Sequence, residues 1–374
     1  MEPPAAAPQE PVAQQQSVVP SAPAPELPSA PLPDSYPDRS TGLIVFGIIE
    51  IALGGLSALM IPFMLLGAVF SRKAMGGPMP AGAYVAGICS YSFAAAILLA
   101  LGIGSIQARR WARALNLIAS VVGLIFGSIM TVFLATVLPS GFMAGMHQAA
   151  ANTPNVMPPS TAAAAIILTL IILFFSFFFV AVPLAFLLFF SRKTVEETCK
   201  RRDPAERWTD RCPLPVLAVS LLLGFGAAYC LLTAVTTPIA TLFGKYLTGW
   251  PAAVLLVAVA VLQGFLAFAL YRLSLAGWWT AFITMSLRLI SETITYGHAD
   301  LLKAYSKMGW SQTRLDYMNA NPTFHKGGLL WFGVAISLIF MVYFLWTKKY
   351  FPRSAESAQA NVPLPPPLSS PPSF

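Results

Sequence analysis

Residues 162–190 read AAAAIILTLIILFFSFFFVAVPLAFLLFF, and no charged side chain interrupts them. An α-helix needs about 20 apolar residues to cross the hydrocarbon core of a membrane, and this stretch is longer than that. Basic residues follow at once in Ser191-Arg-Lys193, where a span would leave the membrane. Comparable apolar stretches recur along the chain between short charged clusters. The pattern predicts a membrane protein built from helices.

The composition excludes a soluble globular protein. Of the 374 residues, 56% are hydrophobic and 10% are charged, and the mean hydropathy is +0.69. Soluble domains carry about 25% charged residues, more than twice this supply. The net charge of +8 comes from basic residues that flank the apolar stretches and form no continuous basic face, which argues against a nucleic-acid partner. The cysteines lack the short paired spacing of a zinc or redox site; they are Cys89, Cys199, Cys212 and Cys230.

Eight apolar spans are predicted. Segments rich in charge, glycine or proline separate them, such as Gln107-Ala-Arg-Arg-Trp-Ala-Arg113 and Gly249-Trp-Pro251. The predicted fold class is all-α, a polytopic transmembrane helix bundle. The spans cover about residues 43–70, 81–106, 114–138, 162–190, 214–243, 251–271, 278–297 and 328–347.

Basic residues predict the orientation of this bundle, because cytoplasmic loops carry an excess of Lys and Arg. With the N-terminus inside, the cytoplasmic segments hold 15 basic residues and the external loops seven. Seven of the cytoplasmic residues lie between Arg192 and Arg211. We therefore expect both termini in the cytoplasm, and a bacterial cytoplasmic membrane as the location.

The two halves of the chain resemble copies of one four-helix module. Each half has a first span with a proline toward its outer part, in Ile61-Pro62 and Thr237-Pro238. Each also has a tight, tryptophan-containing turn after its second span and basic residues after its fourth. An even number of spans per copy gives both copies the same orientation, so the predicted repeat is parallel.

The chain ends are rich in proline and have no apolar run to bury, so we expect both tails to be disordered. Such proline-rich tails could also bind protein partners through an aromatic groove. The predicted organisation is a tail, a first repeat, a charged cytoplasmic linker, a second repeat and a tail. These parts cover residues 1–40, 41–193, 194–212, 213–350 and 351–374.

The turn Arg109-Arg-Trp-Ala-Arg113 resembles the short Arg-Arg-Trp-Ala-Arg turn that follows the second helix of uncharacterised bacterial multi-pass membrane proteins with a duplicated four-helix module. The resemblance covers residues 41–350. It implies a membrane bundle and brings no activity, cofactor or ligand with it.

Glu50 is a candidate intramembrane polar site. It stands in the wholly apolar stretch Phe46-Gly-Ile-Ile-Glu-Ile-Ala52, about two turns into the first span. A charge at this depth is costly and usually faces a bundle interior, a cavity or a partner. Two interpretations stay open: a hydrogen bond to a neighbouring helix or to interfacial water, and a proton or cation site.

Arg288 and Glu292 form the other candidate site, in the seventh span. Residues four apart share one face of a helix, so the two side chains can pair. An ion pair reduces the cost of burying both charges and is a sufficient structural reason for them. The alternative is an anion- or substrate-binding role for Arg288.

Two loops carry local signals. Asp300–Asn321 is expected to hold a short amphipathic helix with Asp300 as its N-cap, lying on the membrane or capping the bundle, with a recognition or lid element as the alternative. The segment Arg192–Arg211 mixes seven basic and five acidic residues. That mixture is typical of a solvated, partly helical linker, with contact to anionic lipid as the alternative.

No motif for catalysis is present in the sequence, whether a His-Glu-x-x-His, a Walker loop or a Gly-x-Ser-x-Gly. We therefore expect no enzyme activity, cofactor or metal. The favoured function is a non-enzymatic membrane component that acts through partners or the lipid bilayer. The alternative is a transporter or channel subunit that uses the intramembrane charges. A cavity lined by Glu50 or by Arg288 and Glu292 favours the alternative, and a solid bundle favours the first.

Overall fold

The computed structural model describes residues 37–74, 81–152, 161–298, 300–320 and 328–351. The chain divides into a unit Met1–Pro37 and a compact unit Asp38–Phe374. Both predicted disordered tails, apart from a few residues beside the bundle, lie outside the described residues. The predicted repeats and the segment between them belong to the second unit, which is helical as expected.

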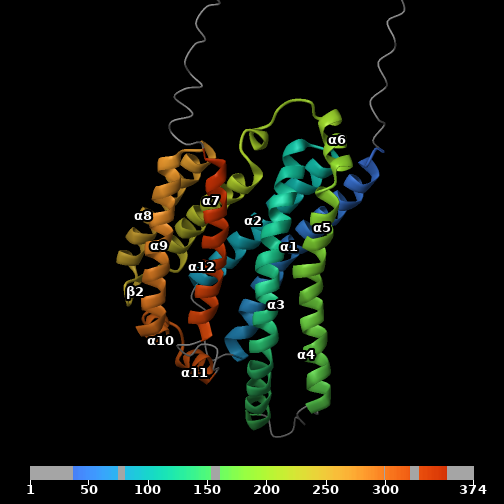
Figure 1. The fold of residues 1–374 in the computed structure, drawn as a ribbon. Helices are drawn as coiled ribbons and strands as arrows, with labels where there is room; N and C mark the ends of the chain where they lie inside the picture. The colour runs from blue at the N-terminus through green and yellow to red at the C-terminus, as the bar shows by residue number, and fades with distance from the viewer. Residues whose placement is uncertain (1–36, 75–80, 153–160, 299, 321–327, 352–374) are drawn as a thin grey trace, which may run out of the picture. The chain divides into compact units, whose positions relative to one another are not determined.

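The first half of this unit begins with two long helices packed along each other, α1 (Ser40–Ala74) and α2 (Ala81–Ile106). Then α3 (Arg110–Asn152) packs against a helical segment that returns beside it (Figure 1). That segment consists of α4 (Thr161–Ser176), a π-helical turn (Phe177–Ala181) and α5 (Val182–Phe190). A short helix, α6 (Lys193–Arg202), and a 3-10 turn (Trp208–Asp210) lead to the second half.

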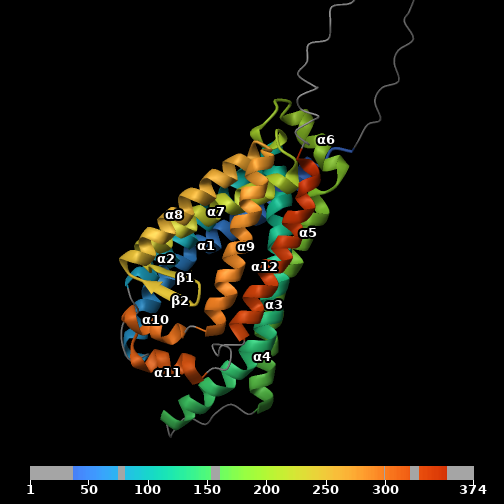
Figure 2. The ribbon, with the colours of Figure 1, turned by 60° about the vertical axis from the view of Figure 1, so that its left-hand side comes forward.

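In the described chain, the second half again contains four long helices, together with a short hairpin and two short helices (Figure 2). Here α7 (Leu214–Thr236) packs along α8 (Trp250–Tyr271), and α9 (Leu275–His298) packs against both α8 and α12 (Gly328–Thr347). Two short helices, α10 (Leu301–Lys307) and α11 (Gln312–Ala320), lie between α9 and α12 in the chain. A 3-10 turn, Lys348–Tyr350, follows α12. The halves meet through α2 and α7, where Phe93 stacks on Phe225, and through α3 and α7.

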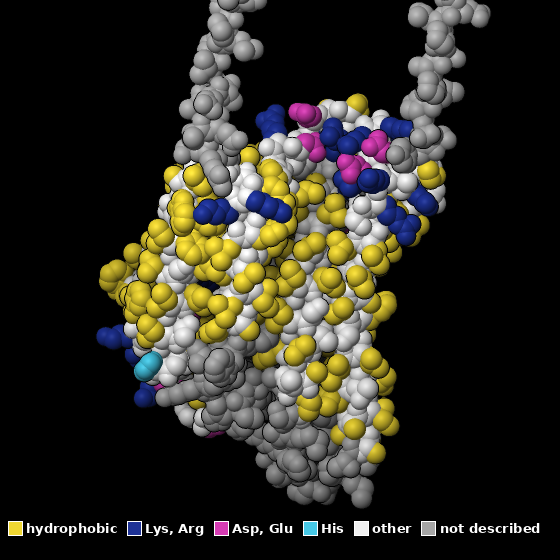
Figure 3. All heavy atoms as spheres, viewed as in Figure 1, with side chains coloured by type: hydrophobic (Ala, Val, Ile, Leu, Met, Phe, Trp, Pro, Cys, Tyr) yellow, Lys and Arg dark blue, Asp and Glu magenta, His cyan; other side chains and the backbone are white. Residues whose placement is uncertain are grey.

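Six segments of the described chain are long and apolar enough to cross a membrane. They match six of the predicted spans: Ser40–Gly67, Ala81–Ile106, Arg110–Thr136, Ala162–Phe190, Leu214–Thr236 and Trp250–Tyr271. Charged side chains gather mainly over one end of the bundle, and hydrophobic side chains cover the flank in view (Figure 3). We call this the charged end. It carries α6, the α2–α3 turn and the α8–α9 turn, and the carbonyl of Trp208 accepts a hydrogen bond from Tyr271 there.

The predicted span 214–243 was wrong at its outer end. The helix α7 stops at Thr236, because the residue before a proline is disfavoured in helical conformation and Pro238 has no N–H to donate. The chain then forms an antiparallel hairpin of β1 (Ile239–Leu242) and β2 (Lys245–Thr248). Phe243 and Gly244 make its two-residue turn, both with positive φ, as tight hairpins require.

The turns after α2 and after α8 have the same geometry. Ala108 has φ 52° and Leu273, 165 residues later, has φ 55°. The next amide donates in each turn to a carbonyl five residues back, from Arg109 to Gly104 at 2.9 Å and from Ser274 to Ala269 at 3.0 Å. Each turn therefore reverses the chain in the same way and starts the next helix antiparallel to the one before.

Candidate functional site

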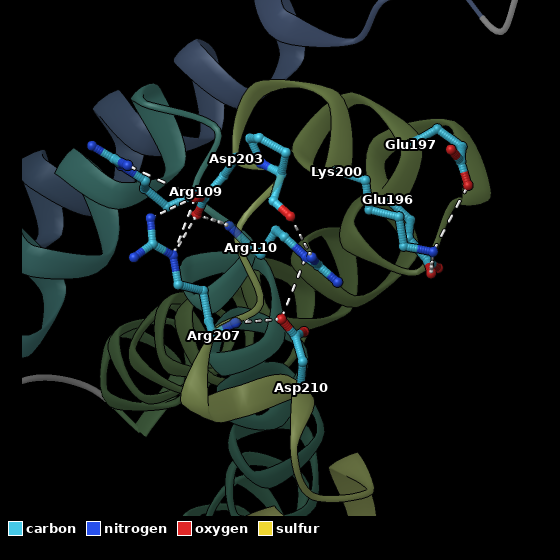
Figure 4. A network of polar contacts seen from close by, with 9 residues as sticks. Arg109, Arg110, Glu196, Glu197, Lys200, Asp203, Arg207 and Asp210 are labelled. Carbon is cyan, nitrogen blue, oxygen red and sulfur yellow. Dashed lines mark hydrogen bonds and ion pairs between the residues drawn. The ribbon is translucent and has the colours of Figure 1, made fainter.

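Asp203 is the centre of a polar network at the charged end (Figure 4). Its side chain is 3% exposed, and its carboxylate accepts a hydrogen bond from Arg207 Nη2 at 2.5 Å and one from the Arg110 amide at 3.3 Å. The single Nε–H of Arg207 is shared between the two carboxylate oxygens, at 3.0 and 3.1 Å. Arg109 lies 3.9 Å away. The hydrogen bonds from Arg207 hold the pKa of Asp203 below its usual value. Asp203 therefore ties the end of α6 to the α2–α3 turn.

The charged segment is more than the solvated linker that its composition suggests. One face of α6 is buried, with Val195 0% and Cys199 1% exposed, against Leu43 and Phe190. Burial raises the pKa of the Cys199 thiol to about 11. Arg113 adds an ion pair to Glu196 at 3.0 Å. The segment thus packs onto the first half of the bundle.

Glu50 is buried where α1, α2 and α3 meet. Its side chain is 1% exposed, and neither carboxylate oxygen has a hydrogen-bond partner among the described residues. The polar side chains beside it are Ser105 and Asn116. They bond to each other, the Asn116 amide donating to Ser105 Oγ at 2.9 Å. The Glu50 carboxyl group therefore faces polar side chains of α2 and α3 that are close enough to interact with it, although neither oxygen has a partner at full hydrogen-bond distance among the described residues.

Arg288 and Glu292 form the contact that their spacing allows. Arg288 Nε donates to Glu292 Oε1 at 2.7 Å. The described residues leave 58% of the Arg288 side chain and 19% of the Glu292 side chain uncovered. Glu292 is therefore mostly covered by protein, whereas part of the Arg288 side chain is not.

The hairpin fixes the outer half of α9, and the sequence did not indicate this. The amides of Phe243 and Gly244 donate to Ser291 Oγ and Thr295 Oγ1, each at 3.0 Å. This docking brings Tyr246 near Tyr296 and Tyr305, and burial raises the pKa of Tyr246. The nearest sequence signal is the pair Phe243-Gly244, which is a weak hairpin pattern without alternation beside it.

The loop after α9 follows the prediction. Asp300 accepts hydrogen bonds from the amides of Leu302 at 3.0 Å and Lys303 at 3.3 Å, which makes it the N-cap of α10. Tyr305 packs against Trp310 at 4.7 Å between ring centroids. A second short helix, α11, follows over residues 312–320.

A groove of about 270 Å³ lies between α3, α7 and α12. Neither Glu50 nor the Arg288–Glu292 pair lines it. Its lining is apolar except for Tyr343, whose hydroxyl donates to the Pro215 carbonyl at 3.1 Å. The lining includes Leu117, Val121, Ile125, Leu214, Ala218 and Ile339.

In the described part of the chain, no three His, Cys, Asp or Glu side chains converge as a metal site requires. The four cysteines are free thiols. The polar groups therefore offer two candidate sites within helices, at Glu50 and at Arg288, and one network at the charged end. Comparison of the chain with protein-family models, curated proteins and solved structures finds no match.

Proposed function

We propose that this integral membrane protein is a non-enzymatic component that holds the acyl chain of an anionic phospholipid in the groove between α3, α7 and α12. The observation that carries the proposal is the groove itself, because its lining is apolar and its one hydroxyl, on Tyr343, is already bonded to Pro215. Such a surface offers nothing to a polar solute. It suits a hydrocarbon chain, which gains only packing and apolar contact.

The charges beyond the groove favour an anionic headgroup. Two basic residues lie just beyond the ends of the lining helices toward the charged end. Arg211 stands three residues before Leu214, the first residue of α7, and Lys348 directly follows α12, five residues after Tyr343. Among the described residues neither cation has a carboxylate partner. Lys348 lies over the ring of Trp279, with its Nζ 4.6 Å from the ring centroid. Basic sites between membrane helices on the cytoplasmic side attract anionic lipids.

The proposal includes eight spans, with α9 and α12 crossing the membrane beside the six apolar segments, and a parallel repeat of four spans. The matched turns at Ala108 and Leu273 support the repeat. A close contact between small residues within each half also supports the repeat. A Cβ atom added to Gly104 would lie 2.7 Å from the Cβ of Ala112, and one added to Gly277 would lie 2.7 Å from the Cβ of Ala269. Both pairs are related by the same 165-residue step as the turns.

The charged end is proposed to face the cytoplasm of a bacterium, with both termini on that side. The basic excess over the external loops supports this orientation. This orientation would put Arg211 and Lys348, which lie beyond the groove, at the surface of the cytoplasmic leaflet, where anionic lipids attract Lys and Arg.

One specific observation supports the transporter alternative: 58% of the Arg288 side chain is not covered by protein. The solid packing around Glu50 and the separation of both charged sites from the groove favour the lipid-binding function.

Filling the groove tests the proposal. Val121→Trp and Ile125→Trp place a large ring in it from α3, whereas Val132→Trp alters an exposed position of the same helix outside the lining. Protein purified in mild detergent is analysed by native mass spectrometry for retained phosphatidylglycerol. We expect the two groove variants to lose at least half of the lipid that wild type retains, and Val132→Trp to keep it. Equal retention in all four proteins contradicts the proposal.

A further inference from the structure

Arg288 has hydrogen-bond donors that the described residues do not use. A guanidinium carries five N–H groups, and the contact that Arg288 makes is the one from Nε to Glu292 at 2.7 Å. The four N–H groups of its Nη atoms have no partner among the described residues, and 58% of the side chain is uncovered. An arginine in a membrane-spanning helix is costly unless a carboxylate, a carbonyl, water or a ligand satisfies it.

The Arg288 side chain extends from the face of α9 that is turned toward the other helices. Ala281 and Thr295 lie seven residues before and after Arg288, which is close to two helical turns, so the three share one stripe. Both neighbours are 0% exposed. Arg288 is 13 residues from the start of α9 and ten from its end, so it lies about 20 Å and 15 Å from those ends. The open guanidinium is therefore near the middle of the helix and on its inner face.

The surroundings are polar and aromatic. Cys230 of α7 and Tyr296 of α9 are close enough to interact electrostatically with the Arg288 charge. Beyond Tyr296 lie Tyr246 of the hairpin and Tyr305 of α10. Phenol hydroxyls can donate to an anion without bringing a charge of their own. The hairpin bonds to Ser291 and Thr295 hold this wall of the site in position.

We propose that Arg288, with Tyr296 beside it, binds a small oxyanion that carries a carboxylate or a phosphate group. The planar Nη edge matches the two oxygens of such a group, which a compact ammonium does not. Glu292 acts as a positioning residue, because its bond to Nε orients the guanidinium and leaves the Nη edge free. Its negative charge also balances Arg288, so the site favours a monoanion over a more highly charged ligand. This binding role goes beyond the lipid-holding function.

Thermal unfolding of the full chain in phosphatidylcholine nanodiscs tests the site. Tryptophan fluorescence is followed with increasing sodium acetate or inorganic phosphate, against sodium chloride at equal ionic strength. We expect both oxyanions to raise the unfolding temperature of wild type above the chloride value. In Arg288→Lys the apparent affinity should fall about tenfold, equivalent to about 1.4 kcal/mol. Arg272→Met, an arginine over Phe268 outside the site, should respond like wild type.

The double variant Arg288→Met, Glu292→Leu keeps the experiment decisive, because it removes both charges and leaves none unpaired. It should fold and should lose the oxyanion effect. Repeating the titration in nanodiscs that contain phosphatidylglycerol distinguishes a free oxyanion from a lipid headgroup. If only this lipid stabilises the protein, the oxyanion belongs to a headgroup. In that case the double variant should lose the stabilisation and Val121→Trp should keep it. The proposal is overturned if the double variant responds like wild type, or if neither soluble oxyanions nor phosphatidylglycerol stabilise wild type.

Discussion

At the scale of single residues, the two candidate sites within helices compensate their charge differently. Arg288 has Glu292 one turn away, and the pair forms within one helix. Glu50 has no basic side chain beside it, and its oxygens have no hydrogen-bond partner in the described part of the chain. Leaving a buried polar group without a partner costs about 1–3 kcal/mol. Ser105 and Asn116 lie beside the carboxyl group without reaching full hydrogen-bond distance, so we expect the bundle to give up stability at Glu50.

Replacing Glu50 by leucine should not destabilise the protein. Glu50→Leu removes two unsatisfied oxygens and keeps a side chain of similar size, so we expect an unfolding temperature in detergent equal to or above that of wild type. Asn116→Leu is the matched control, because it leaves Ser105 Oγ without its donor and should lower stability by about 1–3 kcal/mol. If Glu50→Leu is the less stable of the two, Glu50 has a bound proton donor or cation that its oxygens require.

At the scale of elements, α6 shows how a charged segment becomes part of the bundle. Its buried face packs through Val195 and Cys199, and its C-terminal end is held by Asp203. The pKa of Asp203 is lowered by the hydrogen bonds from Arg207. A lowered pKa means that the ionised carboxylate is favoured in the folded state. The contribution to stability is complete above the unfolded value of 3.8 and is lost as the pH falls through the lower folded value.

Asp203→Asn should release α6. The amide keeps one accepting oxygen but loses the negative charge and the second oxygen that accepts from Arg207, so the loss should amount to about 1–3 kcal/mol. Cys199 reports the release, because its thiol is buried on α6 and unreactive while α6 is docked. We expect faster maleimide labelling of Cys199 in the variant at pH 7, mapped by peptide mass spectrometry. At a pH below the folded pKa of Asp203, the difference in unfolding temperature from wild type should vanish.

Glu206→Gln is the control for this experiment. Glu206 is an exposed acid of the same segment, so its substitution should leave Cys199 labelling at the wild-type rate. Unchanged labelling in Asp203→Asn would show that the apolar face of α6 holds it without the network.

At the scale of the whole molecule, the topology depends on α9 and α12. Six segments of the part of the chain that the structure describes are long and apolar enough to cross a membrane. The helix α9 is less apolar because it carries Arg288 and Glu292. Its inner stripe of Ala281 and Thr295 and its packing between α8 and α12 are typical of a bundle helix. The number of crossings after α8 decides on which side α10 and α11 lie.

A scan of introduced cysteines measures that number. With eight spans and the charged end inside, single cysteines at residues 193–210 and 272–274 should be protected from a membrane-impermeant maleimide in intact cells. Cysteines at residues 300–320 should react. Protection at both 272–274 and 300–320 would remove α9 from the spans, and reaction at 193–210 would reverse the orientation.

The membrane class and most of the helices could be predicted because they are local properties of the chain. Residues 162–190 are long and uncharged enough to cross a bilayer wherever they stand, and Asp300 caps a helix through the amides of the second and third residues after it. The four-residue spacing of Arg288 and Glu292 likewise made their contact foreseeable, since a helix brings such residues to one face.

The remaining features arise from contacts between residues far apart in the chain. Ile239–Thr248 continues the apolar composition of α7, and only its pairing and its bonds to Ser291 and Thr295 make it a hairpin. Asp203 accepts a hydrogen bond from the amide of Arg110, which is 93 residues away in the chain. The groove needs side chains from three separate helices. Composition and periodicity describe the surface that each segment offers, whereas the partner of that surface depends on how the helices pack.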